Sequence, residues 1–317
     1  MTAMFLFPGA HRSIDASGES GYTLVEIMIT LTILTIVSGT VFDGVLRMTR
    51  VNNTVHNRSE MHSGVRNATE LLQQEIGQAG RIALPGEAEL ADAVVSGIYP
   101  AVLTVTVSST EGMFVGQNLV VDTGDNEETV TLTAVNPGTG QITASFVMGH
   151  ADGAPVTVRG GFSAGVVPTT MTDGSTDSVL KIFGDIHSDG EMVYVEYTCD
   201  TVTGNLYRNV MPITAASKPD ITVEHVLLNN ILENPDETPC FTYQEKPVNG
   251  TTFVTQVAVT LTVRTEKEDP ITGAYQMETK ALLNVSPRNV FHVWQMASLQ
   301  IGNRVQPMPA SVEALLP

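Results

Sequence analysis

The pattern of apolar side chains changes twice along this chain, and each change predicts a different kind of element. From Tyr22 to Phe42 the sequence is apolar or uncharged apart from Glu26, and sixteen uncharged residues follow that carboxylate. A helix over these 21 residues would span roughly 30 Å at about 1.5 Å per residue, which matches the hydrocarbon thickness of a bilayer. The pattern predicts a membrane anchor or a secretory signal, but no clear small-residue cleavage site follows the run.

Beyond Phe42 the helical period continues, but only one face stays apolar. No proline occurs between Tyr22 and Ile82, and Gly80 followed by Pro85-Gly86 marks a stop. We therefore expect one helix over 22–81 whose second half packs its apolar stripe against a sheet. The residues of that stripe recur mostly three or four apart: Val51, Val55, Met61, Val65, Ala68, Leu72, Ile76 and Ala79.

After Gly86 the period of the sequence becomes two, with Thr and Val alternating between turn sequences such as Asn136-Pro137-Gly138. This alternation indicates antiparallel β structure. Residues 98–160 are expected to form a small inserted β module, and 301–317, with three prolines, a loose tail. The strands predicted most clearly are Val102–Val107, Asn118–Asp122, Thr129–Thr133, Val179–Phe183, Met192–Thr198, Thr252–Arg264 and Gln276–Val285.

Charge separates the same two parts of the chain. The formal net charge is −18, and residues 82–317 carry 27 acids and 10 bases, so this segment accounts for −17 of it. An acidic chain with 6% aromatic residues lacks the basic face and the stacking side chains of a nucleic-acid binder. We expect the body's acids, including Glu127-Glu128 and 266–269, to be mostly solvated, with a docking surface for a basic partner as the alternative.

The residues before the apolar run resemble a known processing motif. Gly21-Tyr22-Thr23-Leu24-Val25-Glu26 resembles the start of type IV prepilins and pseudopilins, in which a Gly and a Glu five residues later open a long apolar helix. The resemblance implies that residues 1–21 are a leader, removed on the cytoplasmic side by the prepilin peptidase. It also implies N-methylation of the new amino terminus on Tyr22. Glycine offers the peptidase no obstructing side chain.

Glu26 lies one helical turn after Tyr22, so its carboxylate can meet an ammonium at the start of its own helix or of a neighbour's. The resemblance implies pairing with an adjacent subunit in a filament. The simpler alternative is an acid favoured by the dipole at a helix N-terminus, worth about 0.3–1 kcal/mol. Two features depart from the family: the leader has only Arg12 as a clear positive charge, and Arg47 and Arg50 follow the anchor. The orientation, with the N-terminus cytoplasmic, therefore rests on the resemblance and not on charge.

Two further segments resemble particular subgroups of this family. Glu70–Gly80, ELLQQEIGQAG, and Ser286-Pro287-Arg288-Asn289 resemble W-type (PilW-like) minor pilins, and the first also resembles J-type pseudopilins. The expectation is a pilin-like α+β fold and a minor pilin held in the inner membrane by one span, with its 82–317 head exported and later displayed on the pilus. Its implied partners are the peptidase, other pilin subunits and the inner-membrane assembly platform. The alternative is a J-type pseudopilin of a type II secretion system.

Other candidate sites in the body are weaker, and no cofactor or enzymatic activity is expected. Gly161–Gly165 matches the G-x-S-x-G elbow around Ser163, but the following Val-Val-Pro-Thr-Thr cannot start a good helix. A membrane-tethered hydrolase is therefore a distant rival, as is an adhesin whose inserted module binds a ligand directly. The loop from Asp185 resembles an EF-hand loop, with Asp185, Asp189 and Glu196 as weak metal candidates, yet it lacks flanking helices.

The two cysteines are expected to pair. Cys199 and Cys240 lie on a body that the resemblance places outside the cytoplasm, where an even number of cysteines favours one disulfide. The alternative is a pair of free thiols.

Overall fold

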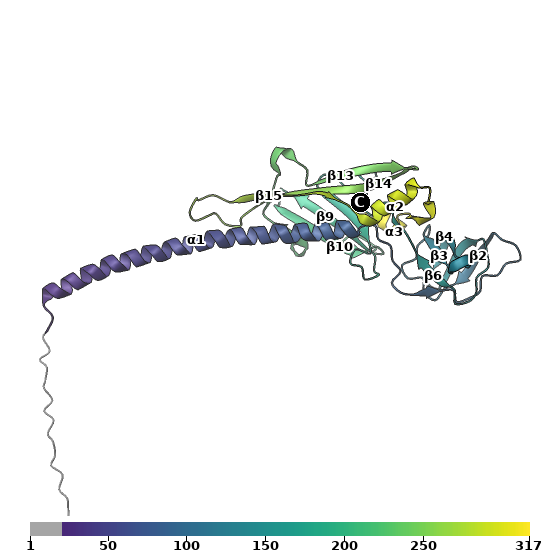
Figure 1. Cartoon of the computed structure of the whole chain (residues 1–317), viewed down its shortest axis with the longest axis horizontal. Helices are drawn as coiled ribbons and strands as arrows, with labels where there is room; N and C mark the ends of the chain where they lie inside the picture. The colour runs from purple at the N-terminus through teal and green to yellow at the C-terminus, as the bar shows by residue number, and fades with distance from the viewer. Residues whose placement is uncertain (1–20) are drawn as a thin grey trace, which may run out of the picture. The chain divides into compact units, whose positions relative to one another are not determined.

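The computed structural model describes residues 21–317, which fall into two compact units divided between Asn53 and Thr54 (Figure 1). The first contains the start of α1 (Leu24–Gln78), and the second contains its end and all the strands. Helix α1 begins two residues later and ends three residues earlier than expected. The predicted leader lies outside the described residues, apart from Gly21.

Helix α1 ends where the chain requires a glycine. Gly80 has a φ of +80°, a conformation that L side chains rarely adopt, and a Cβ there would lie 2.7 Å from Cγ2 of Val290. Its N–H donates to the carbonyl oxygen of Phe183 at 2.9 Å, and its own carbonyl accepts from Phe162 at 2.8 Å. The sequence signal at Gly80 therefore marks the point where the helix joins the sheets.

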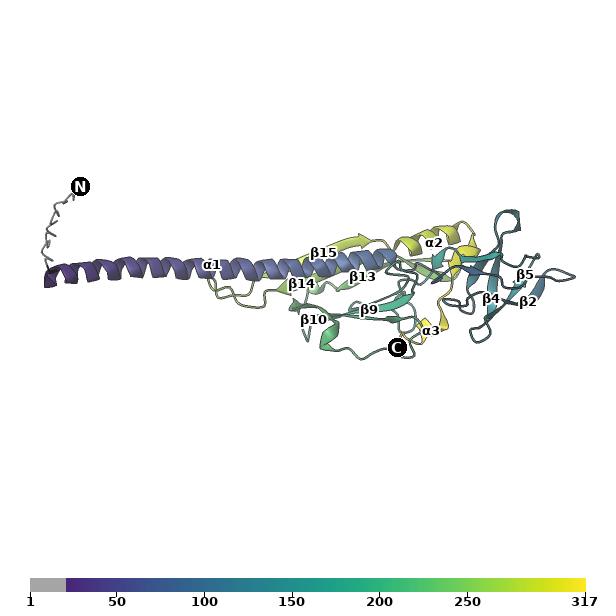
Figure 2. The same ribbon diagram turned by 90° about the horizontal axis from the view of Figure 1, so that it is seen from below.

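The second half of α1 packs the predicted apolar stripe from Met61 onward, whereas Val51 and Val55, also expected in the stripe, are 51% and 60% exposed. Two four-stranded antiparallel sheets and this part of α1 enclose one core (Figures 1 and 2). The α+β prediction, with a long N-terminal helix followed by antiparallel sheets, is confirmed. The first sheet has the order β11 (Val226–Asn229), β10 (Asn205–Pro212), β9 (Val193–Asp200), β8 (Val179–Gly184). The second has β12 (Ile231–Leu232), β14 (Thr251–Arg264) and β13 (Phe241–Val248), with β15 (Met277–Val285) also paired to β14. The helix residues buried in this core are Met61, Val65, Ala68, Leu72 and Ile76.

One charged side chain of α1 is buried in this core. Glu75 is 3% exposed and accepts hydrogen bonds from the guanidinium of Arg208 and the hydroxyl of Tyr197. Burial, and then the neighbouring carboxylate, raises the pKa of Tyr197, so this hydroxyl stays protonated and remains a donor. The buried charge is thus paired, as a carboxylate in an apolar core must be.

The inserted β module is a six-stranded sheet that closes on itself. Its order is β1 (Ala88–Glu89), β6 (Pro155–Val158), β3 (Asn118–Val121), β4 (Glu128–Asn136), β5 (Gln141–Phe146), β2 (Ala101–Thr106). The end of β2 returns to β1 through a Leu90–Val107 bridge and 2.9 Å bonds from Ala91 to Thr106 and from Ser108 to Glu89. The strands begin at Ala88, ten residues before the predicted start at 98, because β1 pairs with β6.

The prediction of a loose tail over 301–317 was wrong. After α2 (Arg288–Ser298), strand β16 (Val305–Gln306) pairs in parallel with β7 (Gly161–Phe162), and α3 (Ala310–Glu313) follows. Val312, Leu315 and Leu316 are buried with Phe162, so the tail forms part of a core. Pro307 follows β16, and Pro309 precedes α3, so neither interrupts an element. The short 3₁₀ turns are Gly124–Asn126, Val223–His225, Pro235–Glu237 and Gly302–Arg304.

Two acids expected to be solvated are buried instead. Glu128 is 6% exposed beside His150, and Asp269 is 5% exposed in the β14–β15 turn. Hydrogen bonds from the N–H of Ile271 and then from the hydroxyl of Thr54 hold the pKa of Asp269 below its ordinary value. Neighbouring donors, which the sequence did not reveal, make these positions favourable for carboxylates.

Candidate processing and assembly site

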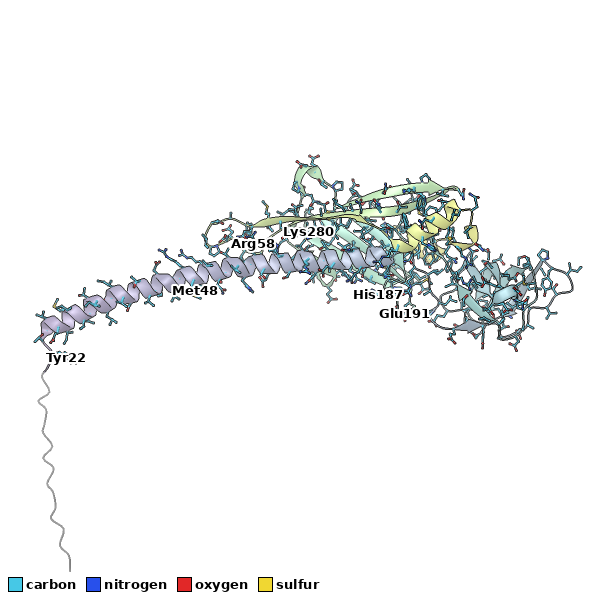
Figure 3. All side chains as sticks on the ribbon, in the orientation of Figure 1. Tyr22, Met48, Arg58, His187, Glu191 and Lys280 are labelled. Carbon is cyan, nitrogen blue, oxygen red and sulfur yellow. A yellow bond between two sulfur atoms is a disulfide. The ribbon has the colours of Figure 1, made fainter. Side chains whose placement is uncertain are left out.

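The segment expected to be cleaved is accessible along its backbone. Gly21 precedes the first turn of α1, and a Cβ at this position would meet nothing within 4 Å. Tyr22 is 83% exposed at the start of the helix (Figure 3). A non-helical, uncovered Gly-Tyr peptide bond is the form that a peptidase can take into its active site.

Thr23 and Glu26 form a reciprocal cap at the start of α1. The N–H of Thr23 donates to Oε2 of Glu26 at 3.2 Å, and the N–H of Glu26 donates to Oγ1 of Thr23 at 3.3 Å. This capping box fixes the helix start just after the cleavage position. The capping role of Thr23 is not among the sequence predictions, although a Thr with a Glu three residues later is the ordinary signal of a capping box.

The apolar part of α1 satisfies its polar side chains internally. The hydroxyls of Thr30, Thr32 and Thr35 donate to backbone oxygens one turn earlier, at 2.7–2.9 Å, and that of Thr40 does the same. These bonds remove the cost of placing a hydroxyl in an apolar medium. These four threonine hydroxyls can therefore enter lipid or a contact with other helices already hydrogen-bonded.

Within the described residues, α1 is the one helix long and apolar enough to cross a membrane, judged by length and composition. Large apolar side chains from Leu24 to Phe42 are 49–75% exposed. The charges resume at Asp43 and Arg47, which pair at 2.9 Å one turn apart. The apolar segment is thus bounded by Glu26 at one end and by this ion pair at the other.

Ser163 is not placed as a nucleophile. It is 7% exposed, and its hydroxyl lies 3.3 Å from the backbone oxygen of Gln306, which it donates to. Strand β7 before it has two residues, and the described segment 166–170 after it forms no helix. The strand–turn–helix context that exposes a nucleophile is therefore missing at this position.

The three metal candidates are not brought together. Oδ1 of Asp185 accepts the N–H groups of Asp189 and Gly190 at 3.0 and 3.3 Å, and its Oδ2 faces Nε of Arg81 at 3.2 Å. Glu196 instead accepts from Lys218 at 2.7 Å. Among residues 21–317, no group of three His, Cys, Asp or Glu is arranged to hold a metal ion. The loop is a turn stabilised by hydrogen bonds to its own aspartate.

The two cysteines are joined. Cys199 at the end of β9 bonds to Cys240 just before β13, with 6.4 Å between their Cα atoms. The N–H of Phe241 donates to the carbonyl oxygen of Asp177 at 3.0 Å next to this bridge. The disulfide therefore links the two sheets that pack on α1.

The comparison with known families agrees with this geometry. The prokaryotic N-terminal methylation motif matches residues 16–42, which include the uncovered Gly21-Tyr22 bond and the apolar helix. The motif indicates a type IV pilin-like or pseudopilin protein that the prepilin peptidase processes and that assembles with other pilins. With one N-terminal apolar helix, it is consistent with anchoring in the inner membrane. No curated protein and no solved structure matches the chain.

Proposed function

We propose that this chain is a W-type minor pilin, cleaved between Gly21 and Tyr22, methylated on Tyr22 and incorporated in a type IV pilus. Its role there is pilus assembly and surface contact. The observation that carries the proposal is the succession of an uncovered cleavage position, a capped apolar half-helix and a second half-helix seated on a folded head. Each part serves one step: processing, insertion and display.

Glu26 has a defined role in this proposal. After cleavage the charged amino group of Tyr22 lies one turn from Glu26, and Thr23 uses only one oxygen of that carboxylate. In a filament core, an unpaired carboxylate would cost several kcal/mol, so each Glu26 requires a cation from a neighbouring amino terminus. This requirement fixes how far one subunit slides along the next.

The proposed pathway places the head outside the cytoplasm. The partners are the prepilin peptidase, the inner-membrane assembly platform and other pilins, which contact residues of the exposed half of α1. The Cys199–Cys240 disulfide supports an oxidising compartment for the head.

A J-type pseudopilin of a type II secretion system is the second candidate, because it would share the same processing and helix. Deleting the chain and scoring both surface pili and secreted enzymes separates the two. Loss of pili with normal secretion supports the minor pilin, and the reverse result favours the pseudopilin. A membrane-tethered hydrolase has no supporting observation, since Ser163 is buried against a backbone oxygen.

Mass spectrometry of the mature N-terminus tests the proposal. We expect a chain that starts at methylated Tyr22; an intact Met1 in assembled filaments would overturn the proposal. Glu26→Ala should permit cleavage and impair assembly. The matched control is Glu60→Ala, which removes an exposed acid from the same helix and should assemble normally. Equal assembly of both variants would contradict the proposed pairing.

A further inference from the structure

One end of the β module gathers three loops. The 122–127 loop joins β3 to β4. The 92–100 and 147–154 loops are bridged where Val94 and His150 exchange backbone hydrogen bonds at 2.9 and 3.2 Å. The opposite end holds the connections to the rest of the chain, since β6 leaves the module at Val158. The loop between β3 and β4 meets the rest of the chain at Glu127, which pairs with Arg159 at 2.6 Å and with Arg304 at 3.8 Å. The open part of this end is therefore formed by the 92–100 and 147–154 loops.

This end carries exposed apolar side chains that do not contribute to the interior of the β module. We name them the apolar rim: Val95, Ile98, Val102 and Val147, which are 76%, 81%, 70% and 58% exposed. The interior is filled by other residues, such as Leu119 and Phe146, each fully buried. Several large apolar side chains on adjoining segments of one surface are typical of an interaction site.

The rim lies beside an open strand edge. On the side of β2 away from β5, which we call outward, the C=O of Thr106 accepts from Ala91 and the N–H of Ser108 donates to Glu89. On the side toward β5, the N–H of Val107 donates to the carbonyl oxygen of Gly140. In an antiparallel strand these directions alternate, so the N–H and C=O groups of Val102 and Thr104 also point outward. Among the described strands, β2 pairs along 101–106 with β5 alone. An extended segment of another chain can therefore add to this edge.

The negative charge of the β module indicates which kind of partner this surface would bind. Residues 88–158 contain eight acids and no Lys or Arg, and Asp92, Asp125 and Asp152 are exposed on the loops of the rim. Nucleic acid and anionic lipid would be repelled, and so would the same module of a second copy. A strand that alternates basic and apolar side chains complements both the acids and the rim.

A buried cluster holds the rim loops in place. The imidazole of His150 is fully buried between Oδ2 of Asp122 at 3.2 Å and Oε1 of Glu128 at 2.8 Å. The other oxygen of Glu128 accepts the N–H of Val147 at 2.9 Å. One histidine thus fixes all three loops, so the surface is formed before a partner arrives.

We propose that the apolar rim and the open edge of β2 bind an extended segment of a partner protein in which basic and apolar residues alternate. The segment pairs with Val102 and Thr104 as an added strand, places its apolar side chains on the rim and directs its basic ones to the acidic loops. This site does not depend on filament assembly and requires no processing of the chain.

The test measures binding of fluorescent octapeptides to the full chain in nonionic detergent. Three probes alternate Lys with Val, Lys with Ser, or Glu with Val. The fourth is the Lys–Val peptide with N-methylated valines, whose backbone nitrogens cannot donate hydrogen bonds. We expect the Lys–Val peptide to bind at least roughly tenfold more tightly than the other three. Each of those three lacks one of the proposed contributions: the apolar side chains, the positive charges or the N–H donors of the valines. Equal binding of the Glu–Val or the N-methylated peptide overturns the proposal.

Matched variants locate the site on the chain. Ile98→Ser with Val102→Ser should weaken Lys–Val binding about tenfold, whereas Val202→Ser with Val223→Ser, at positions 96% and 85% exposed outside the module, should leave it unchanged. Asp152→Lys should also weaken binding, and Asp220→Lys, an exposed acid of the body, should not. Because all these positions are exposed, folding is expected to survive, and equal effects of rim and control variants refute the assignment.

Discussion

Gln306 joins the β module to the rest of the chain, and its removal should destabilise that junction. The side chain is fully buried. Its Nε2 donates to the carbonyl oxygens of Asn118 and Arg159 at 2.8 and 2.9 Å, and its Oε1 accepts the N–H of Asn118 at 2.9 Å. The amide thus pairs with Asn118 at the start of β3 as a strand would.

The loss of unfolding free energy in Gln306→Ala follows from the backbone groups that the substitution leaves without a hydrogen-bond partner. Three partly buried backbone groups, the N–H and C=O of Asn118 and the C=O of Arg159, lose their partner. Each such group costs about 1–3 kcal/mol, and partial access of water lowers the sum, so we expect a loss on the order of 3–5 kcal/mol. Gln306→Glu should be at least as destabilising, because it loses the donor and places a charge against two carbonyl oxygens.

Denaturant unfolding of the full chain in nonionic detergent measures this loss. Hydrogen exchange over 114–121 shows whether it arises at Asn118, whose N–H should exchange faster in the variant. Gln295→Ala, on the exposed face of α2, is the control and should change stability by no more than about 0.5 kcal/mol. A loss below about 1 kcal/mol with unchanged exchange at Asn118 would refute the role assigned to Gln306.

Three further predictions concern the body. Arg208→Ala should cost about 3–5 kcal/mol, because it leaves the carboxylate of Glu75 buried without its cation; an unchanged urea midpoint would contradict this. Replacing both Cys199 and Cys240 by Ser should cost on the order of 3–4 kcal/mol by loop entropy, given their separation of 41 residues; a thermal scan with and without reductant checks it. The lowered pKa of Asp269 adds stability that is present above the ordinary pKa of an aspartate, about 3.9, and is lost as the pH falls through the folded value. Asp269→Asn should therefore flatten the dependence of unfolding on pH between about 5 and 3, and an equally steep profile would exclude this contribution.

Helix α1 and its end at Gly80 could be predicted from the sequence because their determinants are local. The apolar run after Glu26, the stripe from Met61 to Ile76 and the stop at Gly80 are set by neighbours within a few residues. The same holds for strands with clear alternation, such as β4 and β14. The capping role of Thr23 was equally readable and was overlooked.

Helix α2 was also missed, although its signal was present. Val290, Val293 and Ala297 are spaced three and four apart and are all buried. The segment follows Ser286-Pro287, and a proline is common at the start of a helix. Its short length gave the helical period few turns in which to show itself.

The motif around Gly21 and the long apolar helix could thus be predicted from sequence alone, because a motif, a cap and a run of apolar residues act over one or two helical turns. Tertiary structure decided the rest of the head. The pairing of β16 with β7, the clamp of Gln306 on Asn118 and the closure of the β module each join residues far apart in the chain. The burial of Glu128 and Asp269 depends on donors brought in by the fold. Long-range pairing is chosen by the packing of whole elements, and no local pattern of side chains encodes it.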